Sequence, residues 1–322
     1  MTRGRTMLVQ GSEVPVPDGS RAQPLVAAPG RGIGNWTGAP SAASDGAGGY
    51  WLAYRVRRPV TEGRGVAVEL AHWRPGGESE VVARVSRELV GAESLERPSL
   101  VQRSDGAWRL YLSCATWESK HWWIEALDAD TVAELPTGSR TVVLPGSDDL
   151  AVKDPVVCRD TAGWRAWICC HLLDVPGEED RMTTASTSSP DGLTWAPLVT
   201  VLRPDGDGWG GTGWDSRARR VTAVLPTPHA FVAYYDGRAS AAENWYERTG
   251  IAWAATESGQ TQQPFEVLPG PVAQSPVGTH ALRYLTVLPE GNGWRLFYEC
   301  ARPDGAHDLV TELVTGLPPT EE

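Results

Sequence analysis

The sequence is poor in the side chains that usually hold metals or form disulfides. It has five cysteines and six histidines in 322 residues, and the cysteines form no C-x-x-C pair. The histidines do not fall at the close spacing of metal ligands, so no metal site is expected. Carboxylates could receive a divalent ion such as calcium, but no motif specifies one, and we expect no cofactor. The cysteines are interpreted as small buried hydrophobic residues.

Long apolar runs and nucleotide-binding motifs are also missing. No stretch approaches the ~18 apolar residues of a membrane-spanning helix. The first ten residues carry basic side chains without the apolar segment of a secretion signal, so we expect a cytoplasmic protein. A net charge of −11 argues against nucleic acid or an anionic membrane as a partner. There is no P-loop, dinucleotide fingerprint or G-x-S-x-G motif, which argues against those enzyme classes.

One apolar and aromatic phrase, in contrast, recurs along the chain. Its last residues are 60, 56, 65 and 65 positions apart. Each copy is short, rich in aromatic and β-branched residues and preceded by a turn signal, which predicts a strand. A repeat of this period indicates one supersecondary unit that is stacked or arranged around an axis. We therefore predict an all-β fold, a five-bladed β-propeller with four-stranded blades. The five copies are Trp51–Tyr54, Leu110–Cys114, Ala166–Cys170, Phe231–Tyr235 and Leu296–Cys300.

A single domain over residues 1–322 is expected, because no linker-like segment interrupts the repeat. The fifth blade lacks a fourth strand of its own after Leu313. Pro24-Leu25-Val26 matches Pro197-Leu198-Val199, which stands at the fourth-strand position of the third blade. We predict that residues 24–28 pair in the fifth blade and close the ring, which would protect its strand edges. The predicted blades span roughly residues 33–88, 89–146, 147–205, 206–270 and 271–316.

Charged residues gather where the predicted inner strands begin. Inner strands line the central channel of a propeller, and charge on such apolar strands is costly unless it is paired or used. Either these residues form structural ion pairs between blades, or they form a site; their convergence on one channel favours a site. Tryptophan faces suit sugar rings, and Trp36 and Trp214 are expected to face the channel. Asp236 and Arg238 begin a polar, aromatic loop that could cap the channel. The charged set with its aromatic neighbours is Glu96, Arg97, Lys153, Asp154, Trp214, Asp215, Arg219, His280, Arg283 and Tyr284.

Three segments carry a resemblance to known enzymes. Lys153-Asp154-Pro155 opens the third blade, Ser189-Pro-Asp-Gly-Leu-Thr-Trp195 forms a turn, and Trp214-Asp215-Ser216 opens the fourth blade. Together with the layout, they resemble the five-bladed propeller glycosidases of the arabinanase and xylosidase, invertase and levansucrase, and mannoside phosphorylase types. The resemblance implies a carbohydrate substrate, a transition-state-stabilising role for Asp154 and a general-acid role for Asp215.

The chain departs from that family at one catalytic position. The family carries an aspartate on the first strand of blade one, where this chain has Ala39. Glycoside hydrolysis needs two carboxylates flanking the bond. Glu96 could supply the missing one, or phosphate could replace water, clamped by Arg97, Lys153, Arg219 and Arg283. Alternatively, the scaffold has lost hydrolysis and binds a sugar-like ligand or performs other acid–base chemistry on a small metabolite.

The leading hypothesis is a glycoside hydrolase-type enzyme acting on a small glycoside or oligosaccharide in the channel. Its predicted catalytic residues are Asp215, Asp154 and Glu96. Its predicted substrate-binding residues are Trp36, Arg97, Lys153, Trp214, Arg219, Asp236, Arg238, His280, Arg283 and Tyr284.

Overall fold

β-strands make up almost all of the regular structure. The computed structural model describes residues 4–160, 163–205, 211–255 and 263–317. Within these ranges the helical elements are short: α1 (Arg87–Val90) and 3-10 turns at Val60–Glu62, Val132–Thr137 and Ala241–Glu243. No helix in the described ranges is long and apolar enough to cross a membrane. The all-β prediction is therefore confirmed.

Groups of four antiparallel strands follow one another along the chain. The first group is β4 (Trp36–Ser44), β5 (Tyr50–Arg57), β6 (Gly65–Trp73) and β7 (Glu80–Ser86). The second is β8 (Ser99–Gln102), β9 (Trp108–Ala115), β10 (Trp122–Ala129) and β11 (Ser139–Leu144). The third is β12 (Leu150–Asp160), β13 (Gly163–Leu172), β14 (Met182–Ser189) and β15 (Val199–Leu202). The fourth is β16 (Ala218–Pro226), β17 (Ala230–Arg238), β18 (Arg248–Ala255) and β19 (Glu266–Val267). The fifth is β20 (Leu282–Glu290), β21 (Gly293–Ala301), β22 (His307–Thr315) and β3 (Gln23–Val26), which pairs with β22.

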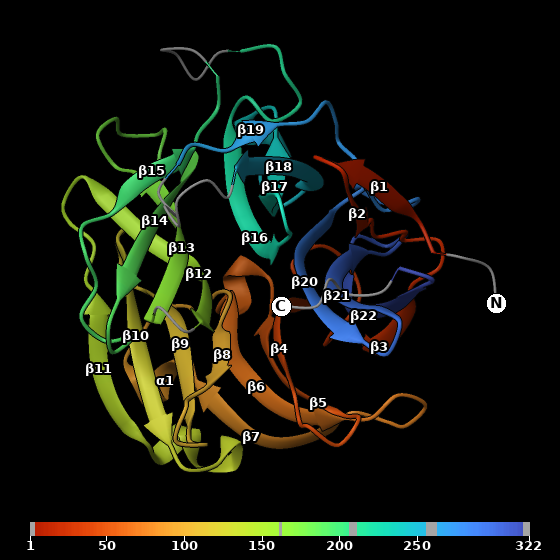
Figure 1. Ribbon diagram of the computed structural model, residues 1–322. Helices are drawn as coiled ribbons and strands as arrows, with labels where there is room; N and C mark the ends of the chain where they lie inside the picture. Colours follow the sequence, from red (N-terminus) through yellow and green to blue (C-terminus); the bar gives the residue numbers. More distant parts are fainter. Residues whose placement is uncertain (1–3, 161–162, 206–210, 256–262, 318–322) are drawn as a thin grey trace.

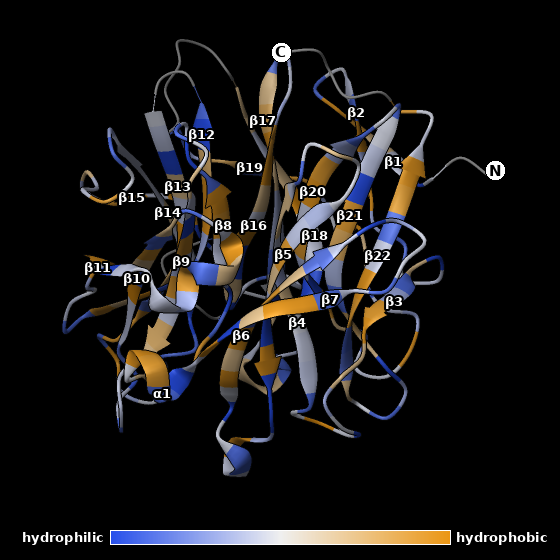
Figure 2. Cartoon of the chain, turned by 90° about the horizontal axis from the view of Figure 1, so that it is seen from below, coloured by the Kyte–Doolittle hydropathy of each residue, from blue (hydrophilic) through white to orange (hydrophobic). Residues whose placement is uncertain are grey.

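The recurring apolar phrase forms the second strand of each group. Successive side chains of a strand point to opposite faces, and here both faces are buried. On β9, Leu110 and Leu112 enter one apolar cluster, whereas Tyr111 enters the next. On β17, Tyr234 and Tyr235 likewise belong to different clusters. The phrase is mostly apolar because each second strand packs between two neighbouring sheets, and Figure 2 shows a long apolar stretch on β17.

The first strands of the groups meet at the centre of the molecule (Figure 1). They contact one another in cyclic order: β4 with β8, β8 with β12, β12 with β16, β16 with β20, and β20 with β4. A side chain near the start of any first strand can therefore approach side chains from all the other groups. This arrangement brings residues that are far apart in the sequence to one place.

The N-terminal segment joins the last group. In β3, Val26 lies opposite Leu309 and Pro24 opposite Val310. Residues 24–28 were predicted to pair with the last group, and the observed strand covers Gln23–Val26. A further hairpin, β1 (Thr6–Val9) and β2 (Ser12–Pro15), was not predicted. It covers an apolar cluster, and the Tyr234 hydroxyl anchors it by donating to the Pro15 carbonyl at 2.6 Å.

Candidate functional site

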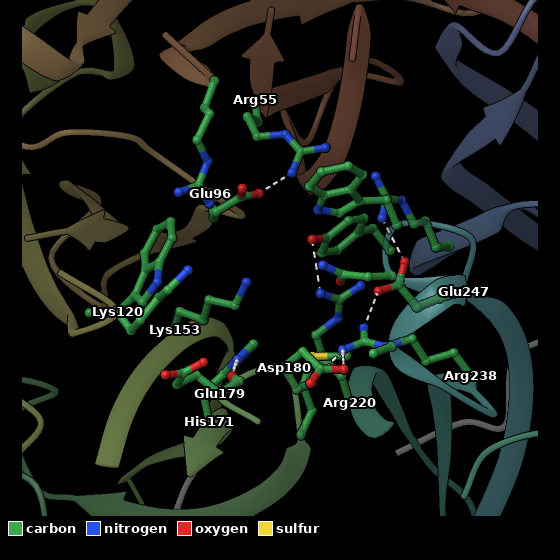
Figure 3. Close-up of a pocket in the computed structure, with 18 of the residues that line it drawn as sticks. Arg55, Glu96, Lys120, Lys153, His171, Glu179, Asp180, Arg220, Arg238 and Glu247 are labelled. Carbon is green, nitrogen blue, oxygen red and sulfur yellow. Dashed lines mark hydrogen bonds and ion pairs between the residues drawn. The ribbon is translucent and has the colours of Figure 1, made fainter. Parts of the chain in front are cut away.

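A cavity of about 320 Å³ opens where the first strands converge. Its lining comes from all five strand groups: Trp36 and Arg55 from the first, Glu96 and Trp122 from the second, Lys153 from the third, Arg220 and Arg238 from the fourth, and Arg283 and Tyr284 from the fifth. Figure 3 shows the charged side chains facing one another across the opening. We call this space the central cavity.

Glu299 is the hub of the ion pairs beneath the cavity. Its side chain is fully buried on β21. It accepts hydrogen bonds from Arg55 Nη2 at 2.8 Å, from Arg283 Nε and Nη2 at 2.9 and 2.7 Å, and from His307 Nδ1 at 2.8 Å. Burial would raise the pKa of Glu299, but Arg283 and Arg55 hold it well below its usual range. The hub thus fixes two of the arginines that line the cavity.

The cavity's carboxylates are held in the ionised state by these arginines. Burial would raise the pKa of Glu96, but Arg55, with which it forms an ion pair, and Lys153 lower it to about 2. Glu247 lies 2.6 Å from Arg283 Nη1 and 2.7 Å from Arg238 Nη1. Despite burial, its pKa is well below the usual range because of Arg283 and other nearby arginines. Glu96 and Glu247 are therefore proton acceptors at most, and both accept from arginines already.

A second buried network lies around Arg220. Its guanidinium is 2.9 Å from Asp154 and 2.7 Å from Asp236, and its Nη1 also bonds the Tyr284 hydroxyl at 2.9 Å. The Tyr284 ring lies under the same guanidinium, with 3.9 Å between the ring centroid and Cζ. Burial raises the pKa of Asp236 to about 6, against the opposing effect of Arg220. Asp154 and Asp236 are both fully buried below the cavity lining and serve as partners of Arg220.

Aromatic rings form one wall of the central cavity. Trp36 stacks on His307 with 4.6 Å between ring centroids, and it meets Trp245 edge-on at 5.7 Å. The Arg57 guanidinium lies close to both tryptophan rings, 4.1 Å from Trp36 and 4.8 Å from Trp245. Burial lowers the pKa of Arg57 to about 9. Trp122, from the second group, also lines the cavity, so flat apolar faces are available on more than one side.

The inner strands share a backbone distortion. Bulges lie between Gly38 and Ser41, Lys153 and Val156, and Arg283 and Thr286. Within these bulges Ala39, Asp154 and Tyr284 have positive φ angles of 50°, 50° and 57°. Bulges re-aim side chains, and positive φ at non-glycine residues is concentrated at functional sites. Ala39 thus has the same positive φ as Asp154, within a corresponding bulge, but presents only a methyl group.

Gly38, directly before Ala39, packs against the hub. A Cβ atom at this position would lie 2.4 Å from Glu299 Oε2 and 2.6 Å from Glu299 Cβ. We expect Gly38→Ala to lower the free energy of unfolding by about 1–3 kcal/mol through overpacking. Urea unfolding followed by circular dichroism measures this change. The control is Gly77→Ala, whose Cβ would approach nothing closer than 3.4 Å, and an equal loss in both variants would contradict the explanation.

The structure brings six of the predicted site residues to the central cavity and places the others elsewhere. Trp36, Glu96, Lys153, Arg238, Arg283 and Tyr284 line it. Arg97, Asp154 and Asp236 are buried beneath the lining, where Arg97 Nη2 donates to the Thr222 carbonyl at 2.7 Å.

The remaining predicted residues lie away from the cavity. The Asp215 carboxylate is bound by Arg219 Nε at 2.8 Å and by the Tyr235 hydroxyl at 2.7 Å. Trp214 stacks on Tyr235, and His280 is exposed. The catalytic assignment of Asp215 therefore stays a prediction without a place in the cavity. Of the suggested phosphate clamp, only Lys153 and Arg283 line the cavity.

Several lining residues were not singled out by the sequence analysis. Arg55 directly follows the first copy of the apolar repeat, on the same strand, and Glu247 and Trp245 belong to the loop between β17 and β18. Lys120 and Trp122 come from the loop and strand after the second-group repeat. The rarity of lysine could have drawn attention to Lys120, since the chain contains two lysines and the other, Lys153, was predicted to bind substrate. Within the described ranges, no group of three or more His, Cys, Asp or Glu residues is arranged to hold a metal ion.

Comparison with known proteins finds relatives at the level of fold. No family model matches the chain, and no curated protein does. Among solved structures, an α-L-arabinofuranosidase from Lactobacillus brevis superposes with a TM-score of 0.66 at 16% identity, over 94% of this chain and 99% of that chain. A thermostable family-43 glycoside hydrolase gives 0.65 at 13% identity, over 92% and 98%. A GH43_1 enzyme from Xanthomonas citri complexed with xylotriose gives 0.60 at 14% identity, over 94% and 95%. The likeness is one of fold. The chain has the β-propeller architecture of these glycoside hydrolases.

Proposed function

We propose that this protein is a five-bladed propeller of the glycosidase type whose central cavity binds a small sugar-like ligand without standard two-carboxylate hydrolysis. The cyclic contacts of the five first strands support five blades, and the pairing of β3 with β22 supports an N-terminal fourth strand in the last blade. A cytoplasmic location remains part of the proposal. Of the three hypotheses raised by Ala39, this is the one in which the scaffold has lost standard hydrolysis and binds a sugar-like ligand.

The composition of the lining supports a sugar-like ligand. Trp36, Trp122 and Trp245 offer aromatic faces, and charged groups between them offer hydrogen bonds. Pockets for small molecules usually combine an apolar wall with a few placed polar groups. At about 320 Å³ the cavity is near the lower end of the usual range of roughly 300–1,000 Å³, which fits a ligand of one or two sugar rings.

The ionisation state of the lining carboxylates carries the argument against hydrolysis. In the described part of the chain, four carboxylates line the cavity, and all four have pKa values below their usual range: Glu96, Glu179, Asp180 and Glu247. A general acid must be protonated when the glycosidic oxygen leaves, which requires a raised pKa. In the glycosidases that the chain resembles, an aspartate on the first strand of blade one acts as base or nucleophile, and the matching residue here, Ala39, has only a methyl group.

Ligand binding and turnover are tested together. We expect simple sugars and short oligosaccharides of arabinose, xylose or galactose to raise the melting temperature of the protein, and aryl glycosides to give no product. Trp245→Ala is expected to weaken sugar binding by roughly two- to tenfold, since an aromatic contact contributes about 0.5–1.5 kcal/mol beyond its buried area. Isothermal titration calorimetry measures both affinities. Trp117→Ala is the matched control, because Trp117 is exposed and lies outside the cavity lining. The affinity of this variant for sugars should equal that of the wild type.

Glycoside hydrolysis is the second candidate, because Glu96 and Glu247 bring two carboxylates to one cavity. Product from the wild type that disappears with Glu96→Gln would favour hydrolysis and overturn the binding-only proposal. Product that also requires phosphate would instead favour phosphorolysis. If no member of the panel binds and none is turned over, the carbohydrate proposal itself is overturned.

A further inference from the structure

Both lysines of the chain line the central cavity. The chain has 27 arginines and two lysines, and the lysines are Lys120 and Lys153. Elsewhere arginine provides the basic partner of the ion pairs, as at Glu247 and Glu299. Arginine suits fixed bidentate pairs, whereas lysine is a compact point charge on a flexible stem. The two lysines therefore mark a part of the cavity whose positive charge is not fixed in bidentate ion pairs with protein carboxylates.

The charge of Lys153 is only weakly matched by protein groups. Among the described residues its one partner within ion-pair distance is Asp154, at 3.7 Å, and that carboxylate already accepts from Arg220 at 2.9 Å and from the Arg97 amide at 3.1 Å. Glu96 is near enough to be influenced by Lys153, but it already forms an ion pair with Arg55. Lys153 is only 8% exposed, so little water is available to solvate its ammonium group in place of a closer carboxylate. Its Nζ lies 5.0 Å from the ring centroid of Trp122. In Figure 3 the end of the Lys153 side chain points into the open centre of the cavity.

Two more cations stand beside Lys153. The Arg64 guanidinium lies over the Trp122 ring at 5.6 Å, and Lys120 lines the same side of the cavity. Among the described residues, no carboxylate comes within ion-pair distance of Arg64 or Lys120. We call Arg64, Lys120 and Lys153, gathered around Trp122, the cationic corner. The arginines of the opposite side, Arg238 and Arg283, are each paired with carboxylates instead.

Cations outnumber carboxylates in the lining, although the chain is negative. Seven lysine and arginine side chains face four carboxylates in the described lining, while the chain carries a net charge of −11. Three more carboxylates, Glu299, Asp154 and Asp236, pair from below with Arg55, Arg283 and Arg220, so the cations of the described lining without a close carboxylate are those of the cationic corner. His171, also in the lining, does not oppose or add to this charge at neutral pH, because burial and the neighbouring Lys153 hold its pKa well below its usual value. A concave site with one sign of charge concentrates ligands of the opposite sign.

We propose that the cationic corner receives an anionic group carried by the ligand, as in a sugar acid or a sugar phosphate. This inference rests on the proposed sugar-binding function and adds the charge of the ligand to it. A partly buried ammonium that lacks a full partner is costly, and an anion that bonds to it removes that cost. Hydrogen bonds between two charged groups are about twice as strong as neutral ones. The sugar ring would lie against Trp122, next to the ammonium that holds its acidic substituent.

Calorimetry with matched sugars tests the inference. The panel is glucose and galactose, glucuronate and galacturonate, glucose 6-phosphate, and inorganic phosphate. We expect at least one charged sugar to bind roughly tenfold or more tightly than its neutral counterpart. Lys153→Met, which keeps the length of the stem, and Lys120→Met should remove this preference, measured within each variant as the ratio of the affinity for the charged sugar to that for its neutral counterpart. Arg74→Met, a change at an exposed side chain outside the lining, should leave all affinities unchanged.

The outcomes separate the inference from the function beneath it. Equal binding of charged and neutral sugars, or a preference that survives both lysine variants, would overturn the cationic corner and leave sugar binding intact. Binding of inorganic phosphate alone, lost in Lys153→Met, would uphold the corner and overturn the sugar ligand. Preference for the acid or for the phosphate identifies which anionic group is recognised, and either supports the inference.

Amine labelling of the unmodified protein provides an independent test. With two lysines in the chain, reductive methylation has two side-chain targets, and mass spectrometry reads each one separately. We expect the preferred charged sugar to protect Lys153 from methylation and the neutral sugar to protect it less. Methylation of the terminal amine serves as the internal reference. Equal labelling of Lys153 with and without the bound charged sugar would contradict the inference even if the variants failed to fold.

Discussion

Replacement of Glu299 with glutamine is expected to lower the free energy of unfolding by about 3–5 kcal/mol, the usual cost of breaking a buried ion pair. The carboxylate of Glu299 is shared by Arg55, Arg283 and His307. Glutamine has nearly the same size, so the close packing against Gly38 would be kept and the charge alone removed. Two buried guanidinium groups would then share the remaining carboxylates, Glu96 and Glu247.

Chemical unfolding in urea, followed by tryptophan fluorescence, measures the change at Glu299. The control is Glu88→Gln, because Glu88 forms an exposed ion pair with Arg87 whose loss should cost no more than about 1 kcal/mol. A similar small loss for both variants would show that the buried pairs contribute little beyond their packing. A loss confined to Glu299→Gln would identify the hub as a main determinant of stability at the centre of the molecule.

The second large effect is expected on acidification. In the folded protein, despite burial, Arg55 and Lys153 lower the pKa of Glu96 to about 2, against an ordinary value of about 4.5. Because the folded-state pKa is the lower one, the stabilising contribution of Glu96 is complete above about pH 4.5 and is lost as the pH falls from 4.5 toward 2. The shift corresponds to a contribution of about 3 kcal/mol at neutral pH. Asp236 acts in the opposite sense. Because burial raises its pKa to about 6, its ionisation destabilises the folded state at neutral pH, and this cost disappears as the pH falls from about 6 to about 4.

Comparison of the wild type with Glu96→Gln isolates this contribution. We expect the wild type to be more stable at pH 7 and the difference in the free energy of unfolding to shrink steadily below pH 4.5. Urea unfolding at a series of pH values between 7 and 2.5 measures the two curves. Glu62→Gln, at an exposed position, should follow the wild type throughout. A difference that stays constant with pH would mean that Glu96 stabilises the fold through packing and not through its charge.

The strands were predictable because their pattern is local. The second strand of each group is buried on both faces, so its residues repeat as an apolar phrase that a single sequence reveals. The pairing of residues near Pro24 with the last group was also accessible, because that segment matches a fourth strand found elsewhere. The β1–β2 hairpin was not, since four-residue strands such as Thr6–Val9 carry too short a pattern to be distinguished from a loop.

Most of the predicted residues that line the cavity stand near the start of an inner strand, as Glu96, Lys153 and Arg283 do. Arg238 is an exception, because it ends the second strand β17. Asp215 was selected by its motif, but its carboxylate is bound by Arg219 and Tyr235 of the same strand group and lies outside the cavity lining. A motif does not reveal which neighbours will hold the side chain. Trp245 reaches the cavity from a loop, whose path depends on how the sheets are packed and not on local sequence.

The pairing of β3 with β22 also constrains the order in which the molecule can assemble. A strand at residues 23–26 has its partner at residues 309–311, almost three hundred positions later. During synthesis the N-terminal strand must therefore wait, without its partner, until nearly the whole chain has emerged. Contacts between such distant segments slow folding, and unpaired strand edges favour association with other chains while they persist. Nascent chains that stall before residue 309 should accordingly be more prone to aggregate than the completed protein.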